Sequence, residues 1–182
     1  FGYNQSGGAG VGFEYYSKML ALAVNKKKKS LPKECFVDLL NGAIPTSFLS
    51  DEKERALYYK KIFSSETVGD LEALKQEFVS VFGVCIQEVC VLIQNRVLAL
   101  LGAQKNISRI SKKGGVVSVS FAVTKTDENI DLVVKHIVSF FSKRRIKYWF
   151  LKSHKNLIFQ YKSLEKDDYI LLSSFINKIT FF

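Results

Sequence analysis

Residues 107–121 read ISRISKKGGVVSVSF. On each side of Lys112-Lys113-Gly114-Gly115, apolar and polar residues alternate with the two-residue period of a β-strand. Paired glycines between two such runs are typical of a tight turn, because glycine adopts backbone conformations that other residues avoid. The stretch therefore predicts a β-hairpin.

The residues around this hairpin predict helices and one further hairpin. After it, we expect a helix over 127–143, a second hairpin over 148–161 and a last helix over 167–178. Before it, we expect a short strand over 35–40 and three helices, at 51–61, at 68–82 and at 87–101, the last closed by Gly102. This order predicts an α+β fold, with a three-helix segment followed by two hairpin–helix units in one compact domain.

The composition fits one folded domain. The chain has 182 residues, of which 47% are hydrophobic, and 15 of them are Phe, so a disordered tail is excluded. Its longest apolar runs are far shorter than the roughly 20 residues of a membrane span. The three cysteines lack the spacing of a zinc site or a disulfide framework, so we expect a cytoplasmic protein with no metal and no membrane association.

The net charge of +10 is unevenly spread. Residues 1–34 carry +4, residues 35–104 carry −3, and residues 105–182 carry +9. Basic surfaces attract phosphate, whereas an acidic stretch suits a positively charged protein partner. The charge pattern thus leaves both a nucleic-acid partner and a protein partner open.

The first 34 residues predict a loop, a helix over about 12–28 and a linker that ends at Pro32. Within the loop, Gln5-Ser6-Gly7 and the following Gly12-Phe13-Glu14-Tyr15-Tyr16 resemble the translocation motif of RecG-type DNA translocases. The resemblance implies that Gln5 couples ATP hydrolysis to stepping along duplex DNA in a longer parent protein. We therefore expect residues 1–34 to be the tail of a motor motif, and residues 35–182 to be a separate regulatory or interaction domain.

The residues that follow extend the resemblance. Ile44-Pro45, the spacing of Arg55 and Tyr59, and the run from Leu71 to Gly83 are similar to the C-terminal domain of the bacterial transcription-repair coupling factor family. That family implies a parent that uses ATP and Mg²⁺ to translocate on double-stranded DNA, removes stalled RNA polymerase and recruits UvrA in nucleotide-excision repair. Its C-terminal domain is implied to be a non-catalytic, autoinhibitory clamp on the UvrB-like module at the N-terminus of the same protein, and to need no cofactor.

The residues themselves also argue against an enzyme. Gly7 and Gly12 have the spacing of a phosphate loop, but Phe13 stands where that loop requires lysine. His136 and His154 lie near no cysteine or serine in a nucleophile arrangement, so both are expected to be structural. No catalytic residue is therefore predicted in this chain.

One acidic pair fits the clamp hypothesis. Asp70 and Glu77 are seven residues apart on the predicted helix and so share a face beside its apolar stripe. They could present an acidic ridge to a basic surface of the N-terminal module. The alternative is that both are solvated side chains on a helix flank.

The rival hypothesis is a nucleic-acid-binding module in the basic, aromatic C-terminal third. Basic side chains there alternate with aromatic rings, a combination found in surfaces on which bases stack. The candidate residues are Lys143, Arg144, Arg145, Lys147, Trp149 and Lys152. Burial of one face of the strand at 148–151 would explain the aromatic residues equally well.

Overall fold

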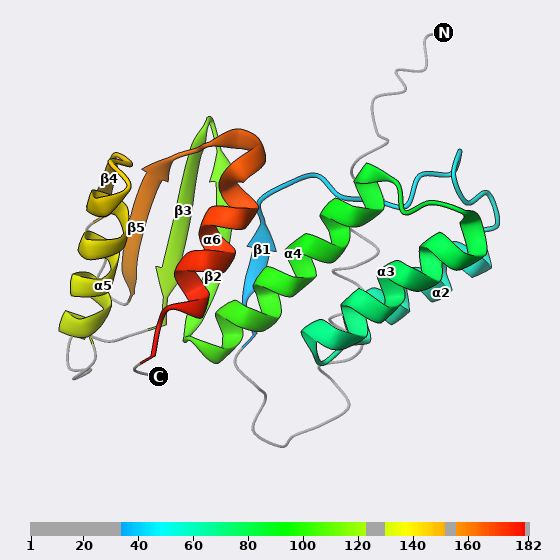
Figure 1. Ribbon diagram of the computed structural model, residues 1–182, viewed down its shortest axis with the longest axis horizontal. Helices are drawn as coiled ribbons and strands as arrows, with labels where there is room; N and C mark the ends of the chain where they lie inside the picture. The colour runs from blue at the N-terminus through cyan, green and yellow to red at the C-terminus, as the bar shows by residue number, and fades with distance from the viewer. Residues whose placement is uncertain (1–33, 123–129, 152–155, 181–182) are drawn as a thin grey trace, which may run out of the picture. The chain divides into compact units, whose positions relative to one another are not determined.

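The computed structural model describes residues 34–122, 130–151 and 156–180, which belong to one compact unit that spans Lys33–Phe182 (Figure 1). The elements, in chain order, are β1 (Phe36–Asp38), α2 (Glu52–Ser64), α3 (Val68–Phe82), α4 (Gln87–Gln104), β2 (Ile107–Lys113), β3 (Val116–Phe121), α5 (Ile130–Lys143), β4 (Tyr148–Leu151), β5 (Leu157–Lys162), the 3₁₀ turn η1 (Glu165–Asp167) and α6 (Asp168–Asn177). The predicted α+β fold is confirmed.

The five described strands form a single sheet in the order β1-β2-β3-β5-β4. Both predicted hairpins are present, as β2–β3 and β4–β5. Gly114 and Gly115 make the first turn with φ angles of 56° and 74°, values that favour glycine. The two hairpins are joined by antiparallel pairing of β3 with β5, and β1 adds to β2 in parallel.

Three helices lie on one face of this sheet (Figure 1). The inward side chains of the strands, such as Val117, Val119 and Phe159, form one buried cluster with residues of α4, α5 and α6. Aromatic rings dominate its centre, where the Phe141 and Phe159 ring centroids lie 5.2 Å apart. This cluster fixes which strand residues face the helices and which face away from them.

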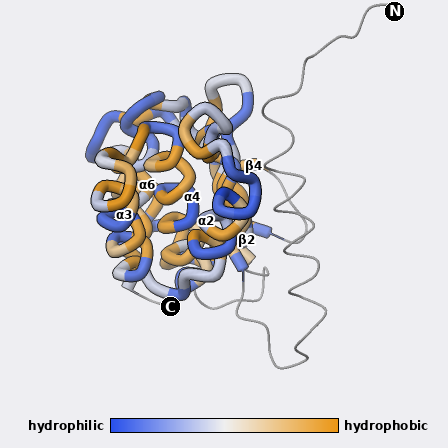
Figure 2. Tube along the Cα trace, turned by 90° about the vertical axis from the view of Figure 1, so that its right-hand side faces the viewer, coloured by the Kyte–Doolittle hydropathy of each residue, from blue (hydrophilic) through white to orange (hydrophobic). Residues whose placement is uncertain are grey.

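A second buried cluster holds α2 and α3 against α4. It includes Tyr58 and Ile62 of α2, Leu71 and Phe78 of α3, and Leu92 of α4. Leu98 of α4 belongs to the first cluster, so the same helix serves both cores. In Figure 2, hydrophobic residues crowd the middle of the described part, and hydrophilic residues follow its outline.

Helix α3 starts and ends as its sequence predicts. The Thr67 side chain accepts a hydrogen bond from the Asp70 N–H, and the Asp70 carboxylate accepts one from the Thr67 N–H, which together form a capping box. Gly83 closes the helix in the left-handed region with φ of 77°. None of the helices among the described residues is both long enough and apolar enough to cross a bilayer.

Gly102 does not close α4, contrary to the sequence prediction, since the helix continues to Gln104. A Cβ atom at Gly102 would lie 2.7 Å from Cys35 Sγ, at the start of the chain segment that leads into β1. The glycine therefore permits close packing between α4 and the Cys35 side chain. The fold requires glycine here because glycine lacks a side chain, and not because its backbone is flexible.

We predict that Gly102→Ala destabilises the domain by about 1–3 kcal/mol, the usual cost of overpacking a tight contact. Alanine has the higher helix propensity, so any loss must come from the contact with Cys35. Urea unfolding measures it. Adding Cys35→Ala should recover part of the loss, whereas Gly69→Ala, a helical site where the nearest atom lies 3.6 Å away, should not destabilise the domain.

Candidate interaction surfaces

One group of predicted site residues cannot be placed, and a second can be placed only in part. Gln5, Ser6 and Gly7 of the translocation motif lie outside the described residues, and so does Lys152 of the basic set. The assignment of residues 1–34 to the tail of a motor motif stays a prediction.

Asp70 is an exposed residue in the first turn of α3. Its carboxylate accepts hydrogen bonds from the backbone N–H groups of Thr67, at 2.9 Å, and Glu66, at 3.2 Å. Contact with the Thr67 hydroxyl, and then these two N–H groups, lower the pKa of Asp70. The side chain thus has a local structural role at the helix start, and it remains in contact with solvent.

Glu77 lies two turns further along the same flank of α3. Its carboxylate forms an ion pair with Lys61 of α2 at 2.6 Å and accepts a hydrogen bond from the Tyr58 hydroxyl at 3.2 Å. The Lys61 and Glu77 side chains are 40% and 36% exposed, so the pair is open to water and salt. Burial, and then the Glu77 carboxylate, raise the pKa of Tyr58.

Val81 extends this flank. The spacings from Asp70 to Glu77 and from Glu77 to Val81 are seven and four residues, which place all three on one side of a helix. Val81 is 57% exposed. We call Asp70, Glu77 and Val81 the α3 flank: a surface strip with two carboxylates and an uncovered apolar side chain.

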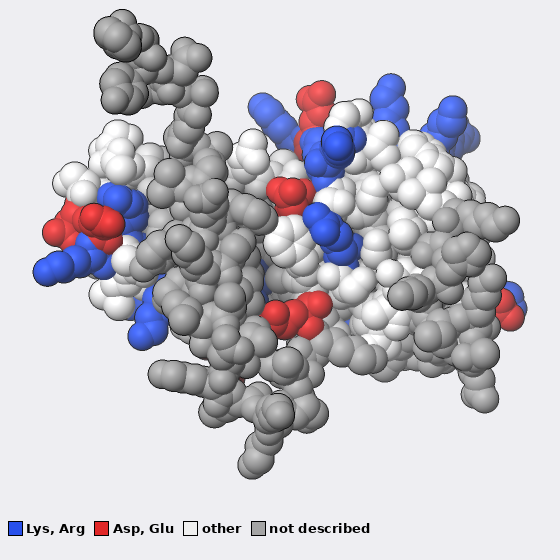
Figure 3. Space-filling view, turned by 180° about the vertical axis from the view of Figure 1, so that it is seen from behind, with Lys and Arg blue, Asp and Glu red and all other residues white. Residues whose placement is uncertain are grey.

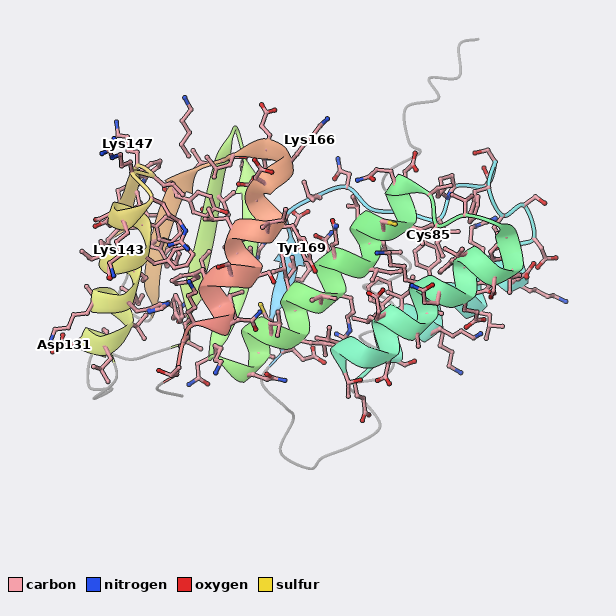
Figure 4. The ribbon with its side chains drawn as sticks, viewed as in Figure 1. Cys85, Asp131, Lys143, Lys147, Lys166 and Tyr169 are labelled. Atoms are coloured by element: carbon pink, nitrogen blue, oxygen red, sulfur yellow. The ribbon has the colours of Figure 1, made fainter. Side chains whose placement is uncertain are left out.

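The basic set divides between the two sides of the sheet. Lys143 ends α5, whereas Lys147 directly precedes β4 (Figure 4). The Arg144 guanidinium donates to the Phe140 carbonyl and lies 3.6 Å from the centre of the Phe140 ring, so it packs on the end of α5. Arg145 is an exposed turn residue with φ of 56°.

Trp149 lies on the face of the sheet that α5 does not cover. Tyr148 and Trp149 are consecutive strand residues and so point to opposite faces. The Tyr148 ring packs against the Phe141 ring of α5, and the two ring centroids are 5.9 Å apart. The Trp149 indole N–H instead donates to Gln160 Oε1 at 2.8 Å. The structure therefore brings Trp149 together with Lys147, but not with Lys143 or Arg144.

Of the remaining chemical candidates, His136 and the cysteines lie within the described residues, whereas His154 lies outside them. His136 of α5 lies 3.3 Å from the Phe175 carbonyl of α6, and burial lowers its pKa. The Cys85 and Cys90 sulfur atoms are 3.1 Å apart at the start of α4, a proximity that their sequence spacing did not indicate. Among the described residues, no group of three His, Cys, Asp or Glu side chains could hold a metal ion.

The model of the TRCF domain family matches residues 40–132, which is just over half of the chain. The chain belongs to the TRCF domain family. Its resemblance to the C-terminal part of transcription-repair coupling factor is thereby confirmed. The matched residues begin just after β1, run into α5 and include α3 with Asp70 and Glu77.

Curated relatives of this TRCF domain carry the same name. A transcription-repair-coupling factor of Staphylococcus aureus (strain USA300) is 32% identical over 127 residues, which cover 66% of this chain and 11% of the relative. That of Borreliella burgdorferi is 27% identical over 165 residues, which cover 88% of this chain and 14% of the relative. The chain thus spans only a small part of the length of these relatives.

A solved structure has the same fold as this TRCF domain. The crystal structure of the C-terminal domain of transcription-repair coupling factor matches with a TM-score of 0.63 and 17% identity, and it covers 81% of this chain and 91% of that chain. At this identity the match supports the fold alone.

We predict that Thr67→Val raises the pKa of Asp70 toward the ordinary aspartate value near 3.9, because it removes the hydroxyl that contributes most to the lowered pKa. NMR titration of the Asp70 carboxyl carbon measures the change. A Thr46→Val variant, at an exposed site outside the capping box, should leave the titration unaltered.

The lowered pKa also predicts a pH dependence of stability. Because the folded-state pKa lies below the unfolded-state value, the stabilisation by Asp70 is fully present above about pH 5 and is lost as the pH falls through the folded-state pKa. The midpoint of thermal unfolding should therefore fall less on acidification in Asp70→Gln than in the wild type. Equal falls would contradict the assignment of this pKa to the capping box.

Proposed function

We propose that this domain is a non-catalytic regulatory domain of a transcription-repair coupling factor and acts as an autoinhibitory clamp. Family membership and the composition of the α3 flank support the proposal. Charged and apolar groups that share one exposed strip suit a protein partner with a basic surface. The proposed partner is the UvrB-like module at the N-terminus of the same protein.

A clamp must bind and also release. The Lys61–Glu77 pair is exposed, and exposed ion pairs contribute only about 0–1 kcal/mol. A cation of the partner can therefore replace or join Lys61 at the Glu77 carboxylate at little cost. Attraction of this size is also easily lost when the partner moves away.

The wider activity belongs to the parent protein. We propose that it is an ATP- and Mg²⁺-dependent translocase on double-stranded DNA, that it displaces stalled RNA polymerase, and that it recruits UvrA once the clamp opens. In that parent, Gln5 would couple ATP hydrolysis to stepping. The domain itself would contribute contacts and no chemical step.

We predict that Asp70→Gln with Glu77→Gln weakens binding of the domain to the N-terminal module at least tenfold. Glutamine at position 70 can still complete the capping box, and glutamine at position 77 can still accept from Tyr58, so the change removes charge with little loss of structure. Isothermal titration with the purified module measures the affinity. In the full-length parent, the same variant should bind UvrA without ATP.

The matched control is Glu52→Gln with Glu54→Gln, which removes two exposed carboxylates from α2. It changes the net charge equally, so it should leave module binding intact. Equal weakening by both variants would show that only the overall charge matters. Unchanged binding in the α3 variant would place the docking surface elsewhere on the domain.

A further inference from the structure

The sheet has one face that no described helix covers. Helices α4, α5 and α6 share a core with the strand residues that point toward them, such as Val119 and Phe159. The residues between these point the other way and are half-buried or exposed. On the three inner strands they include Ser111, Ser118, Ser120 and Gln160.

Four basic side chains belong to this open face. Arg109 and Lys113 of β2, Lys162 of β5 and Lys147 before β4 are all exposed. Strand pairing brings three of them together from three parts of the sequence: Val116 pairs with both Lys113 and Lys162, and the Lys162 N–H donates to the Lys147 carbonyl. Arg109 lies further along β2, where it pairs with Ser120.

The acidic residues of the open face belong to its β1 side, where the exposed Glu34 lies two residues before Phe36. Asp38 of β1, which pairs with Ser111, is the acidic residue that the described strands place on it. In the view from behind, Lys and Arg side chains stand along one rim of the molecule, and Asp and Glu side chains also appear on this side (Figure 3). Lys112 differs from its neighbours, since it points toward the helices and forms an ion pair with the buried Asp168 at 3.1 Å.

Basic charge continues around this end of the sheet. Lys162 also lines a groove of about 810 Å³ together with Lys112 and Lys166. Figure 4 shows Lys147 and Lys166 at the same end of the sheet. On the helix side, Asp168 pairs with Lys112 and Glu165 also lines the groove, so negative charge offsets part of the positive charge there. The excess positive charge of this end therefore lies on the open face, at Lys113, Lys147 and Lys162, which favours a polyanion there.

Trp149 lies on the open face in β4, the edge strand of the sheet. Its indole N–H donates to Gln160 Oε1 at 2.8 Å, and Gln160 Nε2 donates to Ser118 Oγ at 2.7 Å. This row of hydrogen bonds across three strands fixes the indole on the sheet. A second ring, Phe36 of β1, lies 4.8 Å below the Arg109 guanidinium.

We propose that the open face of the sheet binds single-stranded nucleic acid. Fixed aromatic rings beside exposed cations are the features on which unpaired bases stack while their phosphates are neutralised. The serine side chains between the rings and the cations are small and leave room for a strand. An acidic peptide could form ion pairs with the basic side chains, but it has no bases that would stack on Trp149.

This site is independent of the clamp. The open face lies on β1–β5, whereas the clamp hypothesis uses the α3 flank, which packs in the other buried cluster. Loss of nucleic-acid binding would therefore leave module binding unaffected, and failure of one proposal would not count against the other.

Trp149 is the single tryptophan of the chain, so its fluorescence reports on this face alone. The experiment adds single-stranded oligodeoxythymidine of about 20 nucleotides to the 182-residue chain and records Trp149 emission and fluorescence anisotropy of a labelled strand. We expect quenching that parallels binding. If all four cations contact phosphate, affinity should fall about 50-fold between 50 and 200 mM salt.

The test variant is Lys113→Glu with Lys162→Glu, and the control is Lys53→Glu with Lys60→Glu on α2, where both lysines are exposed. The two variants change the net charge equally. We expect at least tenfold weaker binding in the first and little change in the second. If circular dichroism shows that the first is misfolded, Lys113→Gln with Lys162→Gln replaces it.

Four results would overturn the proposal. They are the absence of binding at 50 mM salt, binding without a change in Trp149 emission, equal weakening by test and control variants, and equal quenching of Trp149 by polyglutamate. The last result would identify an acidic peptide as the occupant of the open face.

Discussion

The described structure depends on one constraint: helix α4 is buried on one side by α2 and α3 and on another side by the sheet. Leu92 and Val97 of this helix contribute to the core with α2 and α3, while Leu98 packs in the core under the sheet. Gly102 lets the same helix approach Cys35 closely at the edge of the sheet. Because one helix serves both cores, we expect the sheet and the helical pair to fold together. Any displacement of α4 would disturb both surfaces considered above.

Much of the fold follows from local patterns in the sequence. The change of period at residue 107 predicts the first hairpin, and Thr67, Asp70 and Gly83 predict the bounds of α3, because each pattern acts over a few residues. The pairing of β3 with β5 joins residues about 40 positions apart and has no local signal. The prediction that Gly102 ends α4 was wrong for the same reason. A glycine that ends a helix cannot be told from a glycine that permits a close contact until the contacting residue, here Cys35, is known.

Less of the candidate surfaces than of the fold could be predicted from the sequence. The sequence correctly places Asp70 and Glu77 on one helix, but the ion pair with Lys61 depends on how α2 packs on α3. The basic and aromatic residues at 143–149 read as one cluster in the sequence, yet strand alternation directs Trp149 away from α5. Conversely, Lys113 and Lys162 come beside Lys147 only through the order of strands in the sheet. Surfaces built from distant segments require the topology.

The central claim is that this domain docks on the N-terminal module of its own parent protein. The most direct measurement is a calorimetric titration of the 182-residue chain with that purified module at low and at physiological salt. The account predicts saturable, one-to-one binding that weakens moderately with salt, because an exposed acidic strip supplies part of the attraction. Absence of binding at low salt, with both proteins folded, would contradict it.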